Sequence, residues 1–161
     1  MIDTKCLNGK LCHDETTLGN WDSLTDSLSS IGASAIIETL AHLSDLKAKP
    51  QNNNDATYAK KITKIEAQID WNQSAENISL MIRAFNPRPV AQTNAKAKQF
   101  ENKVIRIIEA ETVQHESSKN PGSIVQQIKD TCYVATGNGV LSLKKVQLSG
   151  KNVVSIKDFN N

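Results

Sequence analysis

The sequence predicts an α+β protein, with helices in its first part and a small β-barrel or sandwich in its last part. Apolar residues recur at spacings of three and four between residues 18 and 46 and again between residues 78 and 85, which indicates amphipathic helices. From residue 99 onward, short β-branched runs alternate with turn signals, a pattern typical of small all-β domains. Residues 47–57 are polar and lack large apolar side chains, which predicts a linker between the two parts.

The first part is expected to be a pair of helices that covers a sheet. We place the domain boundary near Gln51, so that residues 1–50 and 51–161 form two parts. Thr17 is the expected N-cap of the first helix. Gly32 interrupts the apolar pattern, and a glycine at such a position predicts a kink or a helix–helix corner.

Residues 71–93, WNQSAENISLMIRAFNPRPVAQT, carry start and stop signals for a short docking helix. Ser74 is a good N-cap because its hydroxyl can accept a hydrogen bond from an otherwise unpaired backbone N–H. Pro87 and Pro89 prevent the helix from continuing and favour an extended chain after it. The apolar stripe between these signals consists of Ile78, Met81, Ile82 and Phe85.

The last part is expected to contain several short strands. Asn138-Gly139 is its strongest hairpin signal, because both residues tolerate positive φ. Glu109 and Glu111 occupy alternate positions of the first run, which predicts a solvated strand face. The runs that predict strands are residues 104–113, 123–126, 131–136, 140–148 and 153–156.

The net charge of +2 conceals an asymmetry along the chain. Residues 1–46 hold two basic and seven acidic residues, a net charge of −5, whereas residues 47–161 hold 17 basic and 10 acidic residues, a net charge of +7. The second part therefore has the sign expected of a domain that binds a polyanion. A solvated basic surface without a partner is the alternative that charge by itself leaves open.

Composition also predicts a cytoplasmic protein without metal. No apolar run reaches the length of about 18 residues that a membrane span requires, and the first ten residues lack the pattern of a signal peptide. Three cysteines form no disulfide framework, which agrees with a reducing compartment. Cys6, Cys12 and His13 do not have the spacing of a structural zinc site, so no metal is expected.

RAFNPRP at residues 83–89 resembles the Arg-Ala-Phe-Asn-Pro-Trp-Pro signature of methionyl-tRNA formyltransferases. Two positions depart from the family pattern: Arg88 stands where the family usually has Trp, and Gln92 where it usually has Tyr. The resemblance covers roughly residues 15–159 in order. The other matching segments are ATYAKKITKIEAQIDW at 56–71, PGSIV at 121–125, VATGNGVLSLKKVQLSGK at 134–151 and the closing Asp158-Phe159.

The resemblance implies that residues 1–50 are the helical end of a Rossmann-like catalytic domain and that residues 51–161 form the linker, the docking helix and an OB-like barrel. It also implies a family reaction, the transfer of a formyl group from 10-formyltetrahydrofolate to the amino group of initiator methionyl-tRNA in translation initiation. Formyl transfer requires a proton acceptor and donors that stabilise an oxyanion. The family supplies these from an Asn-x-His motif followed by Ser-Leu-Leu-Pro and from a Leu-Asp-Thr-Gly motif.

The catalytic motifs of the family are not matched. His115-Glu116-Ser117 imitates only part of the first motif, and Lys5 replaces the Gly of the second after Ile2-Asp3-Thr4. Either Asp3 corresponds to the catalytic Asp or that residue lies upstream, and we favour the second interpretation. Gly137-Asn138-Gly139 is followed by β pattern rather than a helix, so it is no phosphate loop. We therefore expect no catalytic residue in this chain, no bound 10-formyltetrahydrofolate, and no formyl transfer by the chain alone.

The expected partner is tRNA, and the resemblance implies initiator methionyl-tRNA. A separate N-terminal catalytic chain is a second expected partner. Aromatic content of 4% leaves little for base stacking, so phosphate contacts by Lys and Arg are expected instead. Arg83, Asn86 and Pro87 are expected to fix the junction between the domains. The candidate tRNA-binding residues are Lys60, Lys61, Lys64, Arg88, Lys103, Arg106, Lys144, Lys145 and Lys151.

Two alternatives remain beside a C-terminal formyltransferase fragment from a truncated or split gene. One is a stand-alone RNA-binding module that acts without a catalytic partner. The other is a non-functional gene remnant whose first helices expose an apolar face, a condition that favours association.

Overall fold

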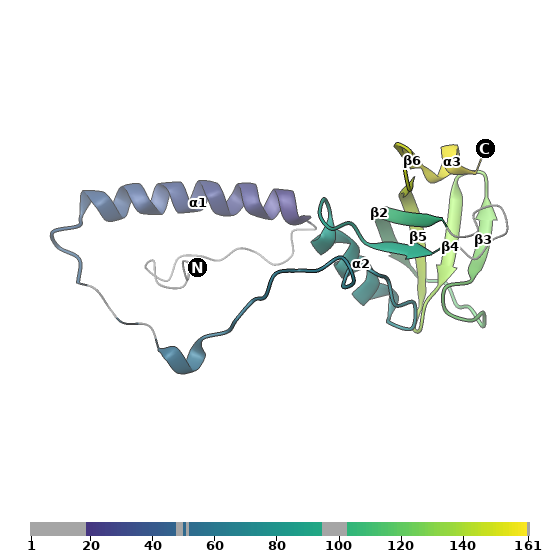
Figure 1. Ribbon diagram of the computed structural model, residues 1–161, viewed down its shortest axis with the longest axis horizontal. Coiled ribbons are helices and arrows are strands. Elements are labelled where there is room, and N and C mark those ends of the chain that lie inside the picture. Colours follow the sequence, from purple (N-terminus) through teal and green to yellow (C-terminus); the bar gives the residue numbers. More distant parts are fainter. Residues whose placement is uncertain (1–18, 48–49, 51, 95–102, 161) are drawn as a thin grey trace. The chain divides into compact units, whose positions relative to one another are not determined.

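The computed structural model describes residues 19–47, 50, 52–94 and 103–160 (Figure 1). Contacts divide the chain into two compact units, Met1–Lys60 and Lys61–Asn161, which we call unit 1 and unit 2. Unit 1 contains the helix α1 (Trp21–Ala41) and a single 3-10 turn, η2 (Asn53–Asp55). The predicted domain boundary near Gln51 concerns the family's domains and stays a prediction. No described helix has the length and apolar content that crossing a membrane requires.

Helix α1 runs without interruption through Gly32, so the predicted kink or corner is wrong. A single glycine inside a helix costs only about 1 kcal/mol relative to alanine, which the remaining turns of a 21-residue helix offset. The N-cap is Asn20, whose side-chain oxygen accepts a hydrogen bond from the Ser23 backbone N–H at 3.0 Å. The expected cap, Thr17, lies outside the described residues. No residue of α1 is buried.

Unit 2 is built on a six-stranded antiparallel sheet, which confirms the α+β class. The strand order is β1-β2-β5-β4-β3, and β6 pairs with β5, so the long strand β5 has three partners. Figure 1 shows β5 between these strands. The elements are α2 (Ala75–Phe85), β1 (Gln92–Asn94), β2 (Val104–Val113), β3 (Ile124–Ile128), β4 (Thr131–Ala135), β5 (Val140–Leu148), β6 (Val153–Ser155) and α3 (Ile156–Phe159).

The core of unit 2 forms where α2 packs on the sheet. Ser74 caps α2 as predicted, because its hydroxyl accepts a hydrogen bond from the Asn77 backbone N–H at 3.2 Å. Ile78 and Ile82 of α2 are buried in the same cluster as Ile107 of β2. The short helix α3 was not expected, because its four residues are too few for a periodic pattern. Its Ile156 joins the same core.

A bulge interrupts the ladder between β2 and β5. Ile107 pairs with Val146, Glu109 with Lys145 and Ala110 with Leu143, so Ile108 and Lys144 have no partner in register. An extra residue on a strand lets neighbouring side chains point the same way instead of alternating. Lys144 and Lys145 are accordingly both exposed although they are adjacent in the strand.

Candidate nucleic-acid interface

A pocket of about 390 Å³ in unit 2 gathers three of the predicted tRNA-binding residues. Lys64, Arg88 and Arg106 line it, and none of the described lining residues is acidic. A concave surface with cations of one sign concentrates its field on an anion. We call it the basic pocket, and its remaining lining residues are Ala67, Pro87, Pro89, Val90, Gln92 and Gln147.

The sheet register places Arg106 between two amide side chains. Gln92 of β1 and Gln147 of β5 are its direct neighbours on the two adjoining strands. Side chains at such paired positions lie on the same face of a sheet and interact. Arg106, Gln92 and Gln147 therefore form one polar row across three strands at the wall of the pocket.

One hydrogen bond holds the guanidinium of Arg106, and a second one fixes the residue that accepts it. Its Nη1 donates to Oε1 of Gln147 at 3.2 Å. Nε2 of Gln147 in turn donates to the main-chain carbonyl of Lys151 at 2.8 Å, so the amide cannot rotate freely. Arg106 is half-buried, and its side chain has no other hydrogen-bond partner among the described residues. Its remaining N–H groups are available to an incoming acceptor.

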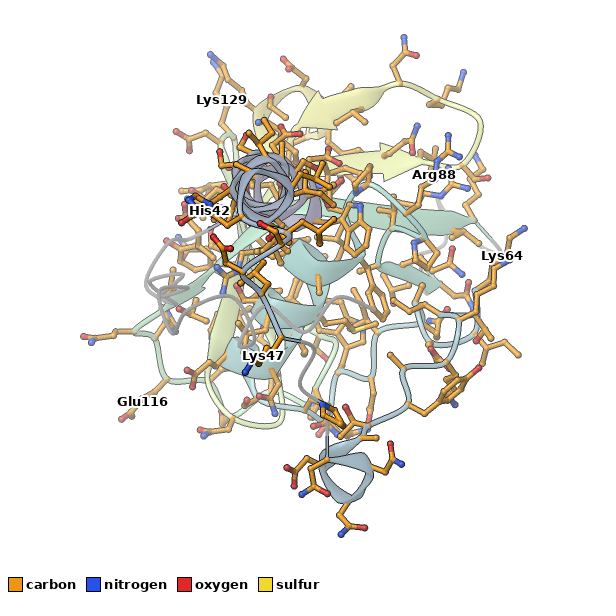
Figure 2. All side chains as sticks on the ribbon, turned by 90° about the vertical axis from the view of Figure 1, so that its left-hand side faces the viewer. His42, Lys47, Lys64, Arg88, Glu116 and Lys129 are labelled. Atoms are coloured by element: carbon orange, nitrogen blue, oxygen red, sulfur yellow. The ribbon has the colours of Figure 1, made fainter. Side chains whose placement is uncertain are left out.

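Arg88 reaches the same pocket from the turn that follows α2. The flanking residues Pro87 and Pro89 have fixed φ angles, which restricts the backbone that carries Arg88. Its side chain is exposed and forms no ion pair within the described residues. Figure 2 shows Arg88 and Lys64 at the same edge of the molecule.

Lys64 is brought to the pocket by a short parallel pairing. The backbone N–H of Ile69 donates to the carbonyl of Gln92 at 2.8 Å, and the N–H of Gln92 donates to the carbonyl of Ala67 at 2.8 Å. These bonds fix the turn that contains Lys64 against β1. Like Arg88, Lys64 is exposed and has no carboxylate partner in the described part of the chain.

Lys144 and Lys145 have acidic neighbours that the sequence analysis did not assign to them. The ammonium group of Lys144 lies 3.0 Å from a carboxylate oxygen of Glu111, and that of Lys145 lies 2.7 Å from one of Glu109. Ion pairs this exposed contribute about 0–1 kcal/mol, so a phosphate could compete for either lysine. The two lysines are therefore partly neutralised, unlike the cations of the basic pocket.

The remaining candidates do not line the pocket. Lys60 belongs to unit 1 and Lys61 is the first residue of unit 2, and both side chains are exposed. Lys103 and Lys151 are exposed beside β2 and β5. Lys151 supports the pocket only through its carbonyl, which accepts the hydrogen bond from Gln147. A tRNA contact by any of these four side chains stays a prediction.

The three expected junction residues lie within unit 2. Nδ2 of Asn86 donates to the main-chain carbonyl of Ile108 at 3.2 Å, and Pro87 lines the basic pocket. Nε of Arg83 is buried and has no hydrogen-bond partner among the described residues. Their proposed role between domains stays a prediction.

His115 has only local contacts, and the described residues form no metal site. Nδ1 of His115 lies 2.7 Å from the carbonyl of its neighbour Glu116, and its ring meets that of Tyr133 edge-on at 5.9 Å. Within the described ranges, no three His, Cys, Asp or Glu side chains are close enough to hold a metal ion. Asp3, like Cys6, Cys12 and His13, lies outside those ranges.

Sequence reasoning missed Gln92 and Gln147 as parts of the site. Their chemistry depends on the register between β1, β2 and β5, which alternation along a single strand does not reveal. The only signal was the Gln at position 92, which departs from the formyltransferase pattern but carries no charge.

Fold and pocket together define a class, a small α+β domain with a basic pocket on its sheet. Residues 61–161 match the protein family described as "Formyl transferase, C-terminal domain". The chain therefore belongs to this family, and the predicted resemblance is confirmed.

Relatives of known name support the same assignment. The chain is 44% identical over 140 residues to methionyl-tRNA formyltransferase of Coxiella burnetii (strain RSA 493 / Nine Mile phase I), covering 86% of this chain and 43% of that protein. It is 35% identical over 136 residues to methionyl-tRNA formyltransferase of Rickettsia bellii (strain RML369-C), covering 84% of this chain and 42% of that protein. The chain thus spans less than half the length of the relatives it matches.

Solved structures of HypX from Aquifex aeolicus share the fold. One variant superposes with a TM-score of 0.62 at 15% identity, over 88% of this chain and 26% of HypX. HypX in complex with tetrahydrofolic acid superposes with a TM-score of 0.56 at 15% identity, over 78% of this chain and 22% of HypX. At this identity the likeness concerns the fold alone.

Proposed function

We propose that unit 2 holds methionyl-tRNA for a formyltransferase by contacting its phosphates. The observation that carries the proposal is the basic pocket, which Lys64, Arg88 and Arg106 line with no acidic residue among the described part of its wall. Kinship with methionyl-tRNA formyltransferases supports tRNA as the polyanion. Phosphate contacts position a nucleic acid without reading its bases, which suits a domain with few aromatic side chains.

The formyl transfer itself is proposed to need sequence that this chain does not supply. Neither the Asn-x-His motif nor a complete Leu-Asp-Thr-Gly motif is present. The donor, 10-formyltetrahydrofolate by resemblance, would bind elsewhere. A lining of three cations, with polar amides and small apolar residues, fits a phosphate rather than a pterin ring. A cytoplasmic location follows from the proposed role in translation.

Helix α1 supports the proposal of a catalytic partner. Its large apolar side chains are exposed, among them Ile36 at 55%, Ile37 at 68% and Leu40 at 63% of their full surface. A contiguous apolar face of this kind usually marks an interface. We propose that it packs on the catalytic part, whether that part belongs to the same polypeptide or to a separate chain.

The test combines tRNA binding with formylation. Binding of the full chain to tRNA is measured at 50 mM and 200 mM salt, and three phosphate contacts to a duplex predict an affinity loss of about 40-fold between them. Formylation of methionyl-tRNA with 10-formyltetrahydrofolate is assayed in the same preparation, and no turnover is expected. A tRNA affinity that does not change with salt concentration would contradict binding through phosphate contacts.

Three outcomes would contradict this proposal. Turnover by this chain alone would show that it carries its own catalytic groups and would direct attention to Asp3 and His115. Absence of both tRNA binding and turnover would favour a non-functional remnant. Tight, salt-sensitive binding to any RNA, with no effect of a catalytic partner, would favour a stand-alone RNA-binding module.

A further inference from the structure

The two positions at which this chain departs from the formyltransferase signature line the same pocket. Arg88 stands where the signature has Trp, and Gln92 stands where Tyr is usual. In the sequence the two residues are four positions apart and separated by Pro89. In the structure both contribute to the wall of the basic pocket, beside Arg106.

Both departures change the chemistry of the pocket in the same direction. An indole and a phenol offer flat π-faces on which a base or an apolar group can stack. A guanidinium and an amide offer N–H donors instead, and a guanidinium presents five of them in a planar fork. The pocket of this chain is therefore suited to an anion with several oxygens.

Arg106 is already oriented for such an anion. Gln147 accepts a hydrogen bond from Nη1 of Arg106 at 3.2 Å. The amide of Gln147 is itself fixed because it donates a hydrogen bond to the Lys151 carbonyl at 2.8 Å. A guanidinium held in one orientation loses little rotational freedom when it binds a phosphate. Lys64 adds a third positive charge on a flexible side chain.

We propose that the basic pocket is a seat for one phosphate group, gripped by Arg88 and Arg106, and that Gln147 acts as the positioning residue for Arg106. This inference rests on the proposed function for the source of the phosphate, which we take to be the sugar–phosphate backbone of the bound tRNA. Inorganic phosphate shares the same chemistry and serves as the probe that separates the two.

The first measurement uses the small number of arginines. The chain contains three, Arg83, Arg88 and Arg106, so the Nε–Hε groups give three signals in an NMR spectrum of the full chain. Phosphate is titrated against chloride at constant ionic strength. Arg88 and Arg106 are expected to shift with saturation, while Arg83, whose Nε is buried, stays in place. Absence of a saturable shift of Arg88 and Arg106 under these conditions would overturn the seat.

The second measurement uses the salt dependence of tRNA binding. Arg88→Trp restores the residue of the family signature, so it is compatible with the fold, and it should lower the slope of log K against log salt by about 1. Lys129→Gln removes one charge from an exposed side chain that Figure 2 shows far from Arg88 and Lys64, and it is the matched control. It should leave the slope close to that of the wild type.

Gln147→Ala separates an oriented site from general electrostatics. The substitution changes no charge, so a diffuse basic surface predicts unchanged binding. An oriented seat predicts that tRNA affinity falls about tenfold and that the phosphate-induced shift of Arg106 weakens. Gln147→Glu would pair Arg106 with a carboxylate and should abolish the shift.

The outcomes distinguish this inference from the proposed function. Saturable arginine shifts together with a reduced slope in Arg88→Trp support both. Saturable shifts without any tRNA binding support a phosphate seat and overturn tRNA as its source. Salt-sensitive tRNA binding that neither Arg88→Trp nor Gln147→Ala alters overturns the seat while the proposed function stands.

Discussion

The side-chain amide of Asn86 donates a hydrogen bond to the main-chain carbonyl of Ile108 over 3.2 Å. Asn86 directly follows α2, and Ile108 is the residue that the β2–β5 register skips. The bond therefore ties the end of the helix to the bulge. Arg88 lies two residues after Asn86, and Arg106 lies two residues before Ile108. The hydrogen bond between Asn86 and Ile108 therefore links the two segments that carry the arginines of the basic pocket.

Replacing Asn86 with Ala should loosen this connection. The bulge carbonyl would lose its partner, and the free energy of unfolding should fall by about 1–2 kcal/mol. Urea denaturation followed by circular dichroism measures the change. Asn152→Ala is the control, because Asn152 is exposed and its side chain makes no hydrogen bond among the described residues. Equal stability of the two variants would contradict a structural role for the contact.

Gly137→Ala is expected to be among the most damaging single changes in unit 2. A Cβ at this position would lie 1.8 Å from the main-chain oxygen of Asn72, which cannot move away without shifting the backbone. Destabilisation of about 2–4 kcal/mol is expected. The control is Gly32→Ala in α1, where a Cβ meets nothing within 4 Å. There, the change should stabilise the helix by about 0.5–1 kcal/mol. A loss of helicity in Gly32→Ala would instead support the helix–helix corner that the sequence predicted at this position.

Removing the acidic partners of Lys144 and Lys145 should strengthen tRNA binding. The double variant Glu109→Gln, Glu111→Gln frees both ammonium groups and removes two negative charges from the face. Affinity at low salt is expected to rise about tenfold, and the salt slope should steepen by about 1–2. Glu116→Gln, at an exposed loop residue, controls for net charge. A similar gain per charge in the control would mean that the position of the lysines is unimportant.

The Asp70 carboxylate should titrate below its ordinary range. Hydrogen bonds from the backbone N–H of Asn72, from its side chain and from the side chain of Gln73 lower the pKa of Asp70. A lowered folded-state pKa means stability that is present above the unfolded pKa of about 3.9 and is lost as pH falls through the folded pKa.

An NMR titration of the full chain checks this directly. The pKa of Asp70 should move back toward its ordinary value in Asn72→Ala. The substitution removes the side-chain donor of residue 72 and leaves only its backbone N–H to bond the carboxylate. Asp70→Asn should destabilise the protein at pH 7 and have less effect near pH 3. An unshifted titration curve for Asp70 in the wild type would refute the assignment.

The sequence predicted most elements of unit 2 because their signals are local. The Ser74 cap, the apolar spacing from Ile78 and the two prolines define α2, and the β-branched run 104–113 matches β2. The weaker predictions failed for local reasons too. Gly32 suggested a corner, but a long helix tolerates one glycine, and α3 is too short to produce a periodic pattern.

The candidate site was only half visible in the sequence. The basic residues were found because charge is a property of each residue by itself. Three of them line a pocket whose described lining holds no acidic residue, and two lysines pair with Glu109 and Glu111. This division depends on which strands adjoin. Strand register is decided by contacts between distant segments, so no single segment carries that information.

By itself, the sequence determined the α+β class, the positions of most strands, the basic character of the second part and the membership in the formyl transferase C-terminal domain family. Only the tertiary structure decided that Arg88, Gln92, Arg106 and Gln147 share one wall. The physical reason is that propensity, periodicity and net charge act over a few neighbouring residues. A binding site instead requires the bulge, the sheet order and the Asn86–Ile108 contact to bring separate segments together.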